Sequence, residues 1–179
     1  DNLYKDGLHR SRFLPAIESL KKHCQIYELN SAQDYRLRTL EQLEIFIIGK
    51  GDEGQLKLES NFSDLTNNEF LEDRNIQILG RKIKTIRLAK GSVWLSFHEI
   101  CEGPRSAKDY IEVCSEFHTL FVSGIPVMGA ENDDSARRFI ALVDECYERN
   151  VNLILSMEAD LKEIYIGERL FEPFKRTIS

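Results

Sequence analysis

Apolar residues recur along the chain with two periods, which divide it into helix-like and strand-like segments. Leu14, Ile17 and Leu20 predict a helix over residues 12–23, with Pro15 in its first turn. The segments 106–117 and from 134 or 135 through 149 show the same helical spacing. Their apolar stripes are Ile111, Cys114 and Phe117 in the first, and Phe139, Leu142, Val143, Cys146 and Tyr147 in the second. Each is preceded by a residue that commonly caps helices, Ser106 for the first and Asp134 or Ser135 for the second.

Strand-like segments lie between these helices. Alternating or continuous apolar runs predict strands over residues 25–29, 45–48, 75–79, 82–88, 93–97, 119–122 and 151–155. In the final third the order is strand, helix, strand, helix, strand, and the strands are largely apolar. This order is typical of a parallel sheet covered by helices. The sequence therefore predicts an α/β fold.

The middle of the chain has a different character. Between residues 44 and 91, short strand-like runs are separated by glycine-containing turns, which predicts a small β-rich lobe inserted between α/β elements. Phe62, Leu65 and Phe70 suggest a short helix or loop packed against that lobe. The run 49–54 (G-K-G-D-E-G) suggests a glycine-rich hairpin turn. We therefore expect three regions, 1–43, 44–91 and 92–179.

Composition and charge narrow the class of protein. The chain has 179 residues, of which 42% are apolar, enough to form a buried core. Its 30 acidic residues outnumber 24 basic ones, and the net charge of −6 repels a polyphosphate backbone, which argues against nucleic acid as the main partner. No apolar run approaches the roughly 20 residues that cross a bilayer, and no leader-like segment opens the chain. We therefore expect a soluble, cytoplasmic protein.

Several kinds of catalytic or metal site are not predicted. The four cysteines form no C-x-x-C pair, which argues against a zinc knuckle or redox motif and fits free thiols in a reducing cytosol: Cys24, Cys101, Cys114 and Cys146. His98 and Glu99 lack the second histidine of H-E-x-x-H, and no G-x-S-x-G elbow occurs. We therefore expect no metal site and no serine hydrolase site.

Four blocks of sequence resemble, in the same order, the AFG-one-like P-loop ATPases. Residues 3–15 (L-Y-K-D-G-L-H-R-S-R-F-L-P) resemble the family's L-Y-x-x-G-L-x-R-x-R-F-L-P stretch. The other blocks are 34–36 (D-Y-R), 97–110 (F-x-E-x-C through D-Y) and 136–144 (A-R-R-F-I-A-L-V-D). Together they span nearly the whole chain, which chance agreement does not account for. Within the family, these blocks most resemble the sequences of the bacterial cell-division branch. Only the stretch 49–75 departs from the family's sequence pattern.

The resemblance implies that the chain is the C-terminal part of an AAA-type P-loop ATPase. The phosphate-binding loop and the magnesium-binding acidic strand of such a protein would lie upstream of Asp1, and the chain begins without Met and ends in a helix-like pattern. The run 49–54 does not match G-x-x-x-x-G-K-[ST], and its acidic residues would repel phosphate. We therefore expect ATP and Mg²⁺ as cofactors of the longer protein, and no ATP hydrolysis by these residues alone.

Two arginines are candidates for catalysis. Phosphoryl transfer spreads negative charge over the γ-phosphoryl oxygens, and an arginine supplied by a neighbouring subunit can stabilise that charge. By resemblance, Arg10 and Arg12 stand where AAA-type proteins carry such a finger, and only one of them needs to act. The alternative is that both flank a helix start, one in solvent and one paired with an acid such as Glu18.

Three further arginines are candidates for nucleotide contacts. Arg137 and Arg138 open the last long helix, whose N-terminal end favours anions, so they are candidates for phosphate sensing in cis. The acidic loop 131–134 offers them surface partners instead, and we favour that structural role. Arg36 of the D-Y-R block is a candidate for contact with nucleotide or with a neighbouring subunit. The residue types of Asp109 and Tyr110 suit helix capping and core packing.

The resemblance also implies partners. It predicts a homo-oligomer that remodels a protein client, such as the tubulin-like division-ring protein, at the inner face of the cell membrane and with at most peripheral membrane association. The alternative is a non-catalytic interaction module in which the β-rich lobe grips a protein partner.

Overall fold

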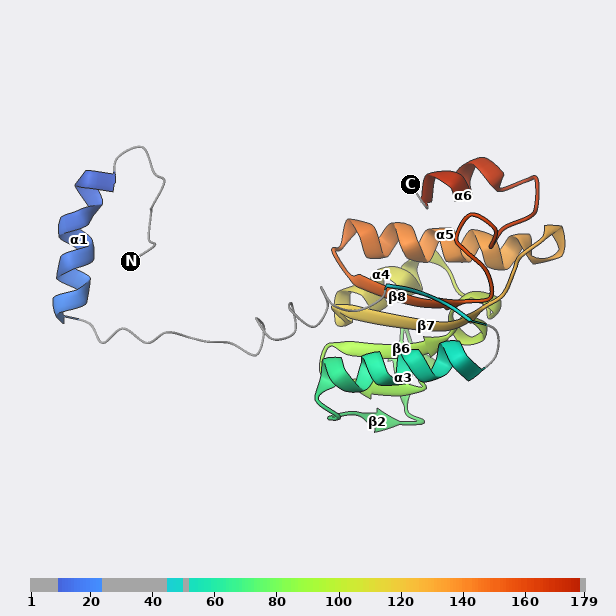
Figure 1. Ribbon diagram of the computed structural model, residues 1–179, viewed down its shortest axis with the longest axis horizontal. Coiled ribbons are helices and arrows are strands. Elements are labelled where there is room, and N and C mark those ends of the chain that lie inside the picture. Colours follow the sequence, from blue (N-terminus) through green and yellow to red (C-terminus); the bar gives the residue numbers. More distant parts are fainter. Residues whose placement is uncertain (1–9, 24–44, 50–51, 178–179) are drawn as a thin grey trace. The chain divides into compact units, whose positions relative to one another are not determined.

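The computed structural model describes residues 10–23, 45–49 and 52–177, and the chain divides into two compact units, Asp1–Arg36 and Leu37–Ser179 (Figure 1). The helices are α1 (Arg10–His23), α3 (Asp52–Thr66), α4 (Ala107–Glu116), α5 (Asp133–Glu148) and α6 (Phe171–Thr177), with short π and 3-10 helices at His98–Glu102 and Ala130–Asn132. The strands are β1 (Phe46–Ile48), β2 (Leu71–Glu72), β3 (Asn75–Ile78), β4 (Arg81–Lys84), β5 (Arg87–Ala89), β6 (Ser92–Ser96), β7 (Thr119–Ile125) and β8 (Asn152–Met157).

The described part of the first unit is α1, which confirms the helix predicted over residues 12–23. It begins two residues earlier than expected, so Pro15 lies inside the helix rather than in its first turn. Lys21 and Lys22 lie in the last turn, where positive charge suits the C-terminal end of the helix dipole. The strand predicted over 25–29 lies outside the described residues.

A six-stranded sheet organises the second unit, in the order β1-β8-β7-β6-β5-β2. The first four of these run parallel, while β5 and β2 extend the sheet antiparallel. β1 pairs with the last strand of the chain: Leu155 N–H donates to the Ile45 carbonyl at 2.9 Å, and Gly49 N–H donates to the Met157 carbonyl at 3.1 Å. The α/β prediction is confirmed.

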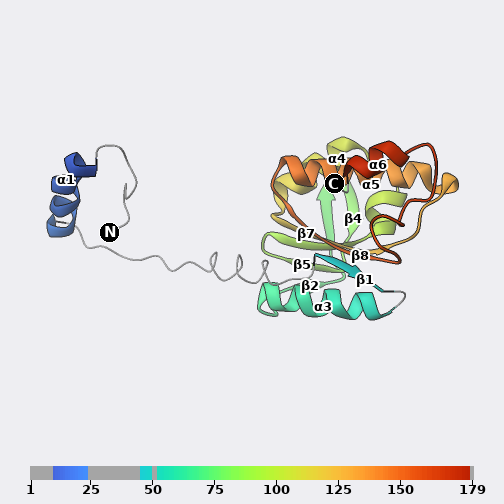
Figure 2. The same ribbon diagram turned by 45° about the horizontal axis from the view of Figure 1, so that its top comes forward.

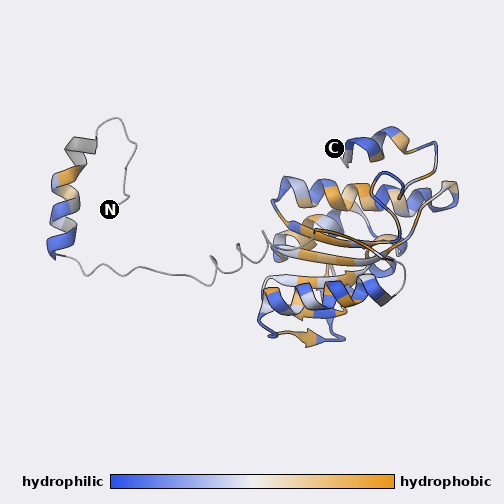
Figure 3. Cartoon of the chain, in the orientation of Figure 1, coloured by the Kyte–Doolittle hydropathy of each residue, from blue (hydrophilic) through white to orange (hydrophobic). Residues whose placement is uncertain are grey.

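Helices cover both faces of this sheet, α3 on one face and α4, α5 and α6 on the other (Figures 1 and 2). On the α3 face, the Phe62 ring lies 5.0 Å from the Phe121 ring and 6.0 Å from the Trp94 ring, between centroids. On the opposite face, Phe139 and Phe174 stack at 6.0 Å. Figure 3 shows the apolar residues concentrated in the strands between these layers. Each face of the sheet therefore has its own hydrophobic core.

The helix α3 corrects the interpretation of the glycine-rich run. Residues 49–54 do not form a hairpin turn, because the chain passes from the end of β1 into α3. Leu58, Phe62 and Leu65 follow at helical spacing and are all buried. The sequence conceals this helix because its apolar stripe is sparse and because Leu56, off the stripe, is 63% exposed.

The region 44–91 also differs from the predicted β-rich lobe. β1, β2 and β5 belong to the six-stranded sheet, and only β3 and β4 form a two-stranded sheet of their own. The strand predicted over 82–88 is interrupted at Thr85, whose N–H and hydroxyl both donate to the Arg74 carbonyl, at 2.8 and 3.0 Å. These bonds turn the chain from one sheet into the other, so the separate β element is a single hairpin.

Candidate functional site

The predicted finger arginines lie in the first unit. Arg10 is the first residue of α1 and Arg12 the third, and positions two apart on a helix lie on different faces. Which of the two acts stays a prediction. Arg36 lies outside the described residues.

Arg137 and Arg138 lie in the first half of α5, as predicted, but their surroundings differ. Arg137 is exposed. Arg138 is partly buried, and its Nη1 donates to the Cys101 carbonyl at 3.1 Å, in the π-helix that follows β6. This bond ties α5 to the end of a strand, which is a structural task. The second unit thus engages one of the two arginines in packing and leaves the other in solvent.

The D-Y pair of the third sequence block holds α4 in place. Asp109 is fully buried and accepts hydrogen bonds from the Ser106 N–H and hydroxyl, each at 2.8 Å, which completes a capping box. It also accepts a hydrogen bond from Arg81 of β4, whose other guanidinium nitrogen donates to the Pro104 carbonyl at 2.7 Å. Although burial alone would raise it, these bonds from Ser106 and Arg81 hold the pKa of Asp109 below its usual value.

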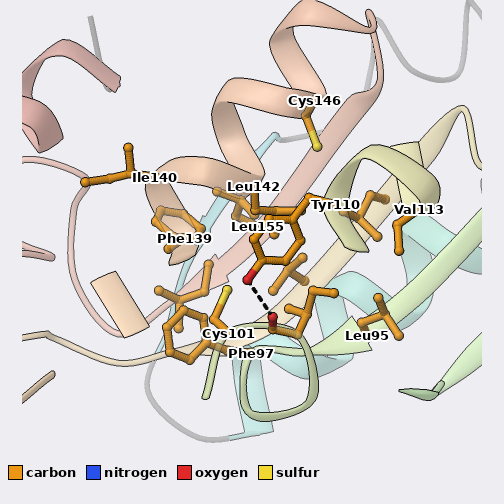
Figure 4. Packing of buried hydrophobic residues seen from close by; sticks show 14 of the residues in the cluster. Leu95, Phe97, Cys101, Tyr110, Val113, Phe139, Ile140, Leu142, Cys146 and Leu155 are labelled. Atoms are coloured by element: carbon orange, nitrogen blue, oxygen red, sulfur yellow. Dashed lines mark hydrogen bonds between the residues drawn. The ribbon is translucent and has the colours of Figure 1, made fainter. Parts of the chain in front are cut away.

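Tyr110 completes this arrangement inside the larger core. Its ring is fully buried, and its hydroxyl donates to the Ile100 carbonyl at 3.0 Å (Figure 4). Burial raises the pKa of the phenol, so it stays protonated and keeps donating. The structural role expected for both residues, capping by Asp109 and packing by Tyr110, is confirmed.

A cavity of about 390 Å³ lies where the parallel strands β1, β6, β7 and β8 end. Its polar lining comes from the last residues of these strands and from the segments that follow: Gly49, Gln55, Ser96, His98, Ser123, Gly124, Ser156 and Glu158. In open α/β sheets, ligands bind at this edge. We name this cavity the strand-end crevice.

The strand-end crevice lies at the switch point of the sheet. β1 continues into α3 on one face, whereas its neighbour β8 leads on toward α6 on the other face. The two connections diverge and leave space between the strand ends. Gly49 at the end of β1 and Ser156 in β8 both line that space.

Two glycines allow α3 to lie close to β8 at this point. A Cβ on Gly54 would lie 2.5 Å from Ser156 Oγ, and one on Gly49 would lie 3.0 Å from the backbone nitrogen of Gly54. The run 49–54 therefore has the G-x-G-x-x-G spacing in the strand–turn–helix context that dinucleotide-binding folds use for close helix–strand packing. The sequence alone predicts a hairpin turn for this run, and the spacing gains meaning only from the strand and the helix that flank it.

The charges at the crevice oppose a polyphosphate. Glu53 is the second residue of α3, and its negative charge opposes the attraction of that helix end for an anion. Among the described residues that line the crevice, Glu158 is a carboxylate and none is lysine or arginine. The described lining therefore lacks the fixed cations that hold a triphosphate.

Serine hydroxyls supply most of the crevice's hydrogen-bonding capacity. Ser123 accepts a bond from Trp94 Nε1 at 3.0 Å, and Ser96 accepts one from the Glu99 N–H at 3.2 Å. Ser156 is 6% exposed and its hydroxyl makes no hydrogen bond to the described residues. His98, at the rim, is bonded to Glu102 at 2.6 Å, and this bond raises the pKa of the imidazole. The lining suits a small polar group without negative charge.

In the described ranges, no group of three or more His, Cys, Asp or Glu side chains is placed to hold a metal ion. No helix in the described part of the chain has both the length and the apolar character needed to span a membrane.

Comparison with known proteins identifies the family of the chain. The family model described as AFG1-like ATPase matches residues 1–179. The chain is 39% identical to the cell division protein ZapE of Escherichia coli over 179 residues, which is 100% of the chain and 48% of that protein. No solved structure matches the chain.

Eukaryotic relatives match over nearly the same range. An uncharacterized protein of Schizosaccharomyces pombe is 32% identical over 166 residues, 92% of the chain and 37% of that protein. Lactation elevated protein 1 homolog B of Danio rerio is 29% identical over 167 residues, 92% of the chain and 33% of that protein. The chain thus spans half or less of the length of these relatives.

Proposed function

Because the chain belongs to the AFG1-like ATPase family, we propose that it is the C-terminal part of a protein that hydrolyses ATP and uses the cycle to remodel a protein client. The match of the family model over residues 1–179 carries this proposal. In it, the chain supplies a catalytic arginine on α1 and the α/β unit that follows.

The division of the chain into units supports this assignment. The first unit, Asp1–Arg36, contains the L-Y-x-x-G-L and D-Y-R blocks and three of the five candidate arginines, Arg10, Arg12 and Arg36. The second unit, Leu37–Ser179, has its own sheet and its own cores. We infer that the first unit completes the ATPase core and that the second unit is a separately folded part of the protein.

The nucleotide itself is proposed to bind outside the second unit. Mg²⁺ and ATP would supply the metal-bridged phosphates at which hydrolysis takes place. The strand-end crevice does not fit them, because its described lining contains the carboxylate of Glu158 and no lysine or arginine. The residues of this chain proposed to act on ATP are therefore Arg10 or Arg12, by donating to the γ-phosphoryl oxygens in a homo-oligomer.

The proposed client follows from the relatives rather than from the site. ZapE is named a cell division protein. We propose that the client is a component of the division machinery, such as the tubulin-like division-ring protein, met in the cytoplasm at the inner face of the membrane.

A second candidate function, a protein-interaction module, is favoured by a specific surface. Two apolar cavities, of about 500 and 300 Å³, adjoin at Phe46 and Leu161 between β1, α5 and α6. Phe46, Ile48 and Phe171 on this surface are 44%, 50% and 53% exposed. Exposed apolar patches of this kind mark interaction sites. This function is compatible with the first if the second unit holds the client.

The arginine assignment is tested in the full-length protein. Arg10→Ala and Arg12→Ala are compared with Lys22→Ala, which removes a charge from the opposite end of the same helix. Loss of the acting arginine should lower kcat for ATP by about 10³-fold or more, while Lys22→Ala should leave kcat unchanged. Arg→Lys at the acting position should stay impaired, because lysine lacks the planar fork.

A mixing experiment separates a shared site from a folding defect. The inactive arginine variant is mixed with a variant disabled only in its phosphate-binding loop. If the arginine acts across a subunit boundary, the mixture should recover part of the lost activity. Unchanged turnover in both arginine variants, or no recovery on mixing, would contradict the proposal.

A further inference from the structure

Two buried thiols face each other across the interface between α4 and α5. Cys114 of α4 and Cys146 of α5 place their Sγ atoms 3.5 Å apart. Their side chains lie in the core, with 6% and 2% exposure. Figure 4 shows Cys146 projecting from α5 into the packed interior. The sulfurs are thus in van der Waals contact, with no side chain between them.

The geometry allows a covalent bond with little movement. A disulfide requires an S–S distance of about 2.05 Å, so the two sulfurs need to approach by roughly 1.5 Å. Each lies near the C-terminal end of its helix, and the two helices already pack together. Rotations about the two Cα–Cβ bonds and a small shift of the helices can supply that movement.

Cys146 also borders a route to solvent. It lines the apolar cavity of about 300 Å³, together with Val143, Tyr147 and Leu153. Tyr147, in the same lining, is 85% exposed. We expect hydrogen peroxide to approach the pair through this cavity, from the side of Cys146.

We propose that Cys114 and Cys146 form an oxidation site, at which hydrogen peroxide converts the thiol pair into a reversible disulfide that cross-links α4 to α5. This inference does not depend on ATP hydrolysis or on the client. The sequence contains no C-x-x-C pair. The fold brings these two cysteines together although they are 32 residues apart.

The chemistry balances in two steps. The thiolate of one cysteine attacks one peroxide oxygen and breaks the O–O bond, which gives a sulfenic acid and hydroxide, and the hydroxide takes up a proton to form water. The sulfur of the other cysteine then attacks the sulfenic sulfur, loses its proton and displaces hydroxide, which becomes a second water. Two thiols are oxidised by two electrons in total and one peroxide is reduced.

The direct contact between the two sulfurs lets either thiol resolve a sulfenic acid formed on the other. Cys101 is an internal comparison: it is fully buried, and burial raises its pKa. It should stay reduced when the pair is oxidised.

The test uses the full-length protein, reduced, freed of reductant and treated with hydrogen peroxide. Free thiols are then alkylated and the protein is digested with trypsin. Cys114 falls in the peptide 109–137, Cys146 in 139–149 and Cys101 in 91–105, so mass spectrometry separates all three. We expect 109–137 linked to 139–149 as the main product, with 91–105 still alkylated, and reversal of the link by dithiothreitol.

Variants and stability provide the controls. Cys101→Ala should retain the cross-link, while Cys114→Ala and Cys146→Ala should each abolish it. Oxidation should raise the Tm of the native protein by about 5–10 °C and leave the Tm of Cys146→Ala unchanged. Wild-type protein alone decides the matter if a variant fails to fold. Thiols that stay reduced until denaturation, or sulfinic acid without a cross-link, would overturn the proposal.

Discussion

The buried carboxylate of Asp109 offers the sharpest test of the structural account. Asp109→Ala removes two hydrogen bonds that cap α4 and the bond to Arg81 that ties the β3–β4 hairpin to that helix. Because Asp109 is fully buried, the vacated site cannot be filled by an equivalent set of bonds to water. We therefore expect α4 and the hairpin to weaken together.

The size of the effect can be worked from these contacts. A lost N-terminal cap costs about 1 kcal/mol. Breaking a buried ion pair costs about 3–5 kcal/mol, but Arg81 keeps 43% exposure and can be solvated after the change, so the lower end applies. We expect the free energy of unfolding to fall by about 3–4 kcal/mol. Asp109→Asn keeps an acceptor for the cap and should cost less.

Urea unfolding followed by tryptophan fluorescence measures this directly. Trp94 is the single tryptophan of the chain and is fully buried, so its emission reports loss of the sheet. The matched control is Lys84→Ala, which breaks an exposed pair with Asp73 at 3.6 Å on the same hairpin. That variant should change stability by less than about 0.5 kcal/mol. A loss below about 1 kcal/mol for Asp109→Ala would refute the reasoning.

Two further outcomes follow from the structure. Burial opposes the charge of Asp109, but its bonds to Ser106 and Arg81 lower its pKa below the unfolded value. Its contribution to the free energy of unfolding is therefore complete above about pH 4 and is lost as pH falls further. Asp109→Asn should make the free energy of unfolding fall less steeply with decreasing pH below about pH 4, and an unchanged slope would contradict this. Phe62→Ala should cost about 3–5 kcal/mol, measured against exposed Leu56→Ala, because Phe62 fills the core beneath α3.

Local pattern predicted the elements whose apolar residues are dense. In α5 the apolar residues are numerous enough to show helical spacing, and in β6, β7 and β8 they form continuous runs typical of strands. The order of these elements along the chain implied a parallel sheet. The helix α3 was predicted only in part, with Phe62 and Leu65 assigned to a short helix or loop, because three buried residues carry its whole stripe. The structure differs from the predicted β-rich lobe because a strand-like run in the sequence does not show which sheet the strand joins.

The candidate site was harder to predict for the same reason. Ser96, Ser123 and Ser156 lie in three strands and Gly49 directly follows a fourth, and only the strand order brings them to one edge. Arg10 and Arg12 were identified by resemblance and Arg138 by its place at the start of a helix, and the structure gives Arg138 a carbonyl partner that no spacing rule implies. The contact between Cys114 and Cys146 likewise depends on the packing of two helices separated by β7.

The place of β1 in the sheet has a consequence for how the protein is made. Phe46 pairs with Leu155, which the ribosome adds about 110 residues later. At about 5–20 residues per second, the apolar strand waits several seconds or more for its neighbour. During that time β1 lacks its neighbouring strand, and the core that buries Ile47 is incomplete. Nascent chains that stall before β8 should therefore be targets for chaperones and proteases.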